Sequence, residues 1–87
     1  MRYKLKEGLT YALLDEEICI FDPNTAEYHN LNSTATFIWQ ILDKNILSFE
    51  EIVDKLLEEY EVERKFCVNQ LKTYLDSLLK ESLIIEL

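Results

Sequence analysis

Glycine and proline are almost absent from this chain, which has one residue of each among its 87. This scarcity excludes a low-complexity or loop-dominated chain. The lone Gly8 cannot form the glycine-rich loop with which many proteins bind phosphate. The two cysteines and single histidine are also too few to complete a structural zinc site. We therefore expect neither a metal nor a cofactor.

The cysteines, Cys19 and Cys67, each lie among apolar neighbours in the sequence. This setting favours two reduced, buried thiols, and a disulfide between them is the alternative. Neither cysteine has a spacing to His29 that is typical of a catalytic pair. Because no other motif that carries chemistry is present, we expect a protein without enzymatic activity.

Positive charge is scarce as well, since 9 Lys and Arg stand against 17 Asp and Glu, for a net charge of −8. Such a surface repels nucleic acid and anionic membranes. No stretch approaches the ~20 apolar residues of a membrane span, and no signal-peptide pattern follows the first residues. We expect a cytoplasmic protein without nucleic-acid or membrane partners, and the length suits one domain over residues 1–87.

The first third of the chain predicts three strands. Alternating apolar residues mark two of them, around 11–13 and 18–20. The intervening residues 15–17, Asp-Glu-Glu, suit a tight turn, as do residues 22–25, Asp-Pro-Asn-Thr. Residues 26–31 then form the third strand. Short connections between three strands favour an antiparallel meander.

The apolar period becomes helical after the third strand. Asn32 or Ser33 can cap a first helix, which ends near residues 43–45. Ser48 and Glu51 have the spacing of a capping box, in which each side chain accepts a hydrogen bond from a free backbone N–H. They predict the start of a second helix.

A third helix is expected from about 63 to 81, and the apolar residues 83–85 after it are expected to be extended. This helix is locally basic in an acidic protein, with a charge of about +3. The charged residues are Arg64, Lys65, Lys72 and Lys80 against Asp76. The helix dipole explains basic residues only near the C-terminal end.

Residues 20–42 carry a pattern that resembles the PqqD-like family. Tyr28-His29-Asn30-Leu31-Asn32 is similar to the family's Tyr-Tyr-x-Leu-Asn, and Ile38-Trp39 to its helical Ile-Trp pair. With the start of the second helix and the closing leucines, the resemblance covers about residues 9–85. Members often have Gly at two places that hold Thr34 or Ala35, and Ser82, in this chain.

That family comprises the peptide chaperone of pyrroloquinoline quinone biosynthesis and the precursor-peptide recognition elements of ribosomally made natural products. The resemblance implies an α+β, winged helix-turn-helix-like fold, with a three-stranded antiparallel sheet followed by three helices. It also implies that a leader peptide adds a strand to the edge of the third strand, against the third helix. Unpaired strand edges do offer rows of backbone donors and acceptors.

We expect the peptide to contact the third strand and one stripe of the third helix. Lys72 in this stripe would favour an acidic leader, whereas Leu75 and Leu79 have the alternative of serving only the core. The predicted binding residues are Glu27, Tyr28, His29, Asn30 and Leu31 through their backbone, with Val68, Lys72, Leu75 and Leu79 from the helix.

The leading hypothesis is therefore a non-catalytic protein that captures a leader and presents it to a modifying enzyme or leader peptidase. A radical enzyme and the peptidase of a lasso peptide pathway are the candidate partners. The alternatives are a winged-helix DNA-binding module and a scaffold subunit of a biosynthetic enzyme. The protein is expected to be a monomer or a dimer paired through the exposed strand edge.

Overall fold

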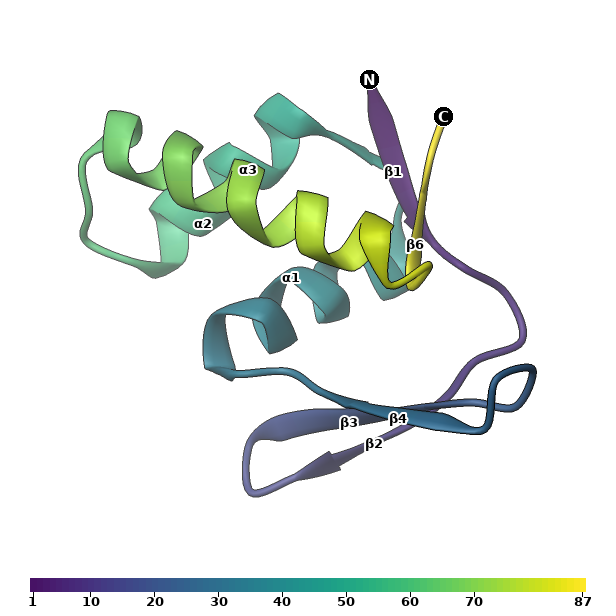
Figure 1. Ribbon diagram of the computed structural model, residues 1–87. Coiled ribbons are helices and arrows are strands. Elements are labelled where there is room, and N and C mark those ends of the chain that lie inside the picture. Colours follow the sequence, from purple (N-terminus) through teal and green to yellow (C-terminus); the bar gives the residue numbers. More distant parts are fainter.

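The computed structural model describes residues 1–87 and contains two three-stranded antiparallel sheets and three helices (Figure 1). This arrangement confirms the predicted α+β class and the predicted order of a three-stranded meander followed by three helices. The elements are β1 (Arg2–Leu5), β2 (Thr10–Leu14), β3 (Glu17–Asp22), β4 (Glu27–Asn30), α1 (Ser33–Lys44), β5 (Leu47–Ser48), α2 (Phe49–Glu59), α3 (Arg64–Lys80) and β6 (Ile84–Glu86).

The predicted meander forms one sheet with the strand order β2-β3-β4. Asp15 and Glu16 form the turn between β2 and β3, both with positive φ, 50° and 67°. Positive φ at both central residues is typical of the turn whose twist matches a β-hairpin. In the second turn, the Asp22 carboxylate accepts a hydrogen bond from the Asn24 N–H at 2.9 Å. Both predicted turns are confirmed.

A second sheet, with the order β5-β1-β6, was not predicted. It brings the two ends of the chain side by side (Figure 1), where the backbones of Arg2 and Leu87 bond to each other in both directions. β5 has only two residues and β1 four, too few for alternation to distinguish a strand. The expected extended segment after the third helix is confirmed as β6.

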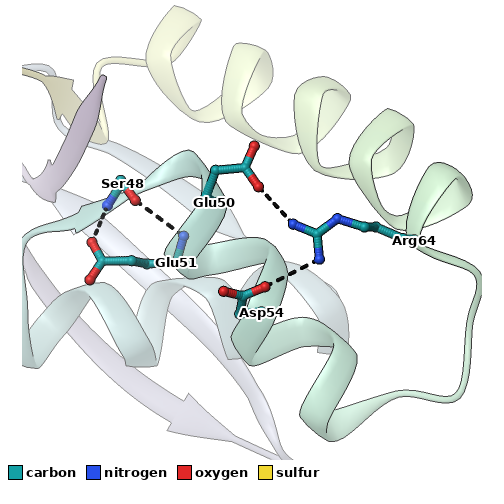
Figure 2. A network of polar contacts seen from close by, with 5 residues as sticks. All are labelled: Ser48, Glu50, Glu51, Asp54 and Arg64. Atoms are coloured by element: carbon teal, nitrogen blue, oxygen red, sulfur yellow. Dashed lines mark hydrogen bonds and ion pairs between the residues drawn. The ribbon is translucent and has the colours of Figure 1, made fainter.

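The helix starts follow the predicted caps. The Asn32 side chain accepts a hydrogen bond from the Ala35 N–H at 2.9 Å and begins α1. Ser48 and Glu51 form the reciprocal capping box of α2, with distances of 2.9 and 3.1 Å (Figure 2). α3 lies within one residue of its predicted bounds. No helix is both long and apolar enough to cross a bilayer.

Arg64 explains part of the positive charge at the N-terminal end of α3. Its guanidinium donates hydrogen bonds to Glu50 at 2.7 Å and to Asp54 at 3.2 Å, both on α2 (Figure 2). All three side chains are more than half exposed, so solvent screens the attraction and the contact adds little to stability. The contact fixes the pairing of α2 with α3 rather than a ligand.

One hydrophobic core joins both sheets to the helices. α1 covers one face of the β2-β3-β4 sheet (Figure 1), against Ile18 and Ile20, which are fully or almost fully buried. Cys67 is buried as predicted, whereas Cys19 is only partly buried. The difference arises because Cys19 alternates with the two isoleucines along β3 and therefore points to the other face.

Candidate functional site

β4 is an edge strand of its sheet, with a free side opposite β3. The Leu31 N–H donates to the Ile18 carbonyl at 2.9 Å, and His29 is paired with Ile20. Bonded and non-bonded pairs alternate along antiparallel strands. The N–H and C=O groups of Tyr28 and Asn30 therefore point away from β3, where they are free to bond to another chain.

α3 lies next to this free strand and to the start of α1. The Asn32 side-chain amide donates to the Tyr74 hydroxyl at 3.1 Å. His29 Nδ1 lies 3.5 Å from a carboxylate oxygen of Glu81 at the end of the helix. These two contacts define the β4–α3 site, which consists of the free edge of β4 and the face of α3 that carries Tyr74 and Glu81.

An apolar pocket of about 280 Å³ continues the site beyond the Asn32–Tyr74 contact. Tyr74 contributes to both features, and Thr34 at the first turn of α1 contributes to the pocket. The volume suits one or two apolar side chains of a bound peptide. The lining residues are Thr34, Leu56, Tyr60, Val62, Phe66, Cys67, Gln70, Leu71 and Tyr74.

The predicted strand residues lie in β4 or directly after it, but only Tyr28 and Asn30 direct their backbone groups outward, whereas those of Leu31 bond to Ile18 and Thr36. Tyr28 is 70% exposed, Glu27 and Asn30 are exposed, and His29 is partly buried. Leu31 is buried in the core. The backbone of β4 is thus accessible along its edge, while the side chains alternate between the two faces of the sheet.

The predicted helix residues occupy another side of α3. Successive residues turn by about 100°, so Lys72 lies roughly 160° around the helix from Tyr74. Val68 and Leu79 are partly buried against the core, and Leu75 is 2% exposed. The structure therefore brings Tyr74 to β4 and turns Lys72 away from it. In the sequence, Gln70, Tyr74 and Glu81 share a helix face, but nothing local marks that face as the one beside β4.

The ionisable groups near the pocket do not form a reactive pair. Burial raises the pKa of the Cys67 thiol, and the nearby Arg64 opposes that shift only in part. A raised pKa leaves the thiol protonated and weakly nucleophilic at neutral pH. What the site offers is a row of backbone hydrogen-bonding groups and an apolar pocket.

Comparison with known proteins gives a consistent picture. The family model described as coenzyme PQQ synthesis protein D (PqqD) matches residues 17–84. The solved structure of TbiB1 in complex with the TbiA(β) leader peptide is 27% identical, covering 97% of this chain and 96% of that chain, with a TM-score of 0.87. Lasso peptide synthetase B1 complexed with the leader peptide is also 27% identical, covering 97% and 98%, with a TM-score of 0.81. No significant match was found among curated proteins.

Proposed function

Because the chain belongs to the PqqD family, to which residues 17–84 match, we propose that it is a non-catalytic recognition protein for the leader segment of a ribosomally made precursor peptide. The leader binds as an added strand along β4 and is presented to a modifying enzyme or leader peptidase. Both similar solved structures are complexes with a leader peptide, which supports a ligand of this class.

The observation that carries the proposal is the free edge of β4 beside α3. The outward backbone groups of Tyr28 and Asn30 supply hydrogen bonds to any extended peptide. Strand addition uses such bonds for affinity and uses side-chain pockets for specificity. An unpaired strand edge can pair with another chain and so promotes aggregation, and proteins usually block such edges. An open edge next to an apolar pocket therefore favours a role in binding a peptide.

The pocket beside Tyr74 selects the peptide in this proposal. Its lining is mostly apolar and contains no charged residue, so an apolar or aromatic leader side chain is the matching ligand. Attraction of an acidic leader by Lys72 remains the alternative source of selectivity, through the predicted stripe of Val68, Lys72, Leu75 and Leu79. Its position away from β4 makes the apolar anchor the stronger proposal.

The test is fluorescence polarisation of a labelled synthetic leader peptide, taken from the precursor encoded beside the gene. Asn30→Pro removes one outward N–H from β4 without breaking the ladder to β3, because proline is tolerated at a strand edge. Leu13→Pro is the matched control on the opposite edge. The Ile18 N–H donates to the Thr36 hydroxyl and the Ile18 carbonyl accepts from the Leu31 N–H, so both groups point away from β2. Its β2 partner Leu13 is therefore a non-bonded position, and the Leu13 N–H also points outward.

We expect saturable binding that Asn30→Pro abolishes and Leu13→Pro leaves unchanged. Equal loss in both variants would show general unfolding, which circular dichroism detects. If the wild-type protein binds no leader but binds the modifying enzyme, the role is that of a scaffold subunit. Binding to duplex DNA that weakens steeply with salt would instead support the winged-helix DNA-binding alternative.

A further inference from the structure

No helix or strand covers the face of the β2-β3-β4 sheet that points away from α1 (Figure 1). Ile18 and Ile20 are buried on the α1 side, so the alternating Cys19 and Phe21 point to the open side. Directly paired residues of antiparallel strands share a face, which adds their neighbours from β2 and β4. The apolar residues of this face are Ala12, Leu14, Cys19, Phe21 and Tyr28, which we name the outer-face patch.

The open face is more apolar than is usual for a solvated sheet face, although it also carries the polar residues Thr10, Glu17 and Asn30. Antiparallel sheets with one buried face normally carry polar residues on the other. Here Leu14 is 61% and Tyr28 70% exposed, and the rings of Phe21 and Tyr28 lie 4.9 Å apart. Contiguous exposed apolar surface of this kind marks interaction sites, and aromatic side chains are enriched at interface centres.

The charges at one end of the patch are all of one sign. Asp15, Glu16 and Glu17 border it at the β2–β3 turn, whereas Glu27 pairs with the buried Asp22 and therefore lies on the α1 side of the sheet. The chain has no Lys or Arg between Lys6 and Lys44. We infer that the outer-face patch is a docking surface for a partner protein that presents an apolar centre with Lys and Arg beside it, opposite the β2–β3 turn.

The acidic border also argues against a second copy of this chain as the occupant. A two-fold dimer places the same patch of both copies face to face. The acidic turn of one copy would then lie against the same sheet of the other copy, which has no Lys or Arg between Lys6 and Lys44 to offer it an opposite charge. A partner with basic residues beside its apolar centre is instead attracted to the acidic turn.

The patch is distinct from the β4–α3 site, because hydrogen bonds at a strand edge lie in the plane of the sheet, whereas the patch lies on its face. If the proposed function holds, a leader strand added to β4 extends this same face. A partner docked on the patch then reaches the side chains of the leader. The docking surface itself does not depend on leader binding.

The experiment measures binding to the full chain by interferometry. The probes are the purified modifying enzyme and the purified leader peptidase encoded beside the gene, each with and without leader peptide. Leu14→Ser tests the apolar centre, and Leu87→Ser is its control, since Leu87 is 58% exposed elsewhere. Glu16→Lys/Glu17→Lys tests the border, and Glu58→Lys/Glu59→Lys makes the same change of charge on α2.

We expect one of the two enzymes to bind, and Leu14→Ser to weaken it about tenfold. Glu16→Lys/Glu17→Lys weakens it similarly and flattens its dependence on salt, while both controls bind like the wild type. The proposal is overturned if neither enzyme binds, or if each test variant behaves like its control. It is also overturned if the protein sediments as a dimer that Leu14→Ser dissociates. Binding of the labelled leader peptide to the same variants, measured by fluorescence polarisation, is expected to be unchanged. Loss of enzyme binding therefore tests the docking surface, and loss of leader binding tests the proposed function.

Discussion

The side-chain hydroxyl of Thr36, in the buried face of α1, accepts a hydrogen bond from the N–H of Ile18 at 3.0 Å. The same hydroxyl donates to the carbonyl of Leu31 at 3.3 Å. It therefore occupies the place where β4 would otherwise continue its ladder with β3. The contact fixes α1 against the end of the sheet, directly beside the free edge of β4.

Replacing Thr36 by Val keeps the shape of this side chain and removes its hydroxyl. The N–H of Ile18 and one bond of the Leu31 carbonyl then lose a partner in a buried site, because Thr36 is 3% exposed. An unsatisfied buried donor costs about 1–3 kcal/mol, so we expect the free energy of unfolding in urea to fall by that amount. Thr73→Val, at an exposed position of α3, is the control and is expected to change little.

Most of the fold was predictable because its signals are local. Alternation along β3, the turn residues around Pro23, and the caps at Asn32 and Ser48 each depend on a few neighbouring residues. The second sheet was not predictable, because β5 and β1 are short and are strands only through pairing with distant segments. Tertiary contacts, not periodicity, fix the element order in space.

The candidate site was also predictable only in part. The β4 edge followed from the order of the strands, but of the five residues predicted to bind through their backbone only Tyr28 and Asn30 have free backbone groups. Which face of α3 lies beside β4 depends on how the helix is rotated about its axis in the packed structure. The apolar spacing identifies the side of the helix that faces the core, but not which flank of that side lies next to β4. The polar contact between Asn32 and Tyr74 joins residues 42 positions apart, and no local pattern indicates it.

The β2–β3 turn offers a stabilising substitution. Glu16 has a φ of 67°, a left-handed conformation that costs a residue with a side chain about 1 kcal/mol or more. Glu16→Gly relieves this strain. Glycine loses more conformational entropy on folding, which offsets part of the gain, so we expect the free energy of unfolding to rise by no more than ~1 kcal/mol. Glu17→Gly removes the same charge from an extended position in β3 and should lower stability by ~0.5–1 kcal/mol. Equal effects of the two variants would contradict the argument.

Tyr11 is expected to titrate late. Its hydroxyl donates to the Asp43 carboxylate at 2.6 Å, and this bond, with burial and the carboxylate charge, raises the pKa of Tyr11 to about 12. A raised pKa in the folded state means that the folded protein holds the proton more tightly than the unfolded chain. The associated stability is complete below pH 10 and is lost as the pH rises towards 12.

Alkaline titration of tyrosinate absorbance measures this shift. Tyr3 also has a raised pKa, chiefly from burial, so the difference between wild type and Tyr11→Phe isolates Tyr11. Asp43→Asn keeps a hydrogen-bond acceptor and removes the charge, and we expect the midpoint of Tyr11 to move back towards its ordinary value. An unchanged midpoint in Asp43→Asn would show that the carboxylate does not hold the Tyr11 proton.

The last prediction separates the two descriptions of the leader site. Tyr74 joins the β4–α3 site to the apolar pocket, while Lys72 lies on the other side of the helix. Tyr74→Ala removes an aromatic wall from the pocket and should weaken leader binding at least about tenfold. Tyr74→Phe keeps the ring and loses only the bond to Asn32, so it should bind nearly normally. Lys72→Glu should have no effect beyond a small change in salt dependence, because the added charge does not face β4. If Lys72→Glu abolishes binding and Tyr74→Ala does not, the peptide follows the stripe through Val68 and Lys72, and charge rather than apolar fit selects the leader.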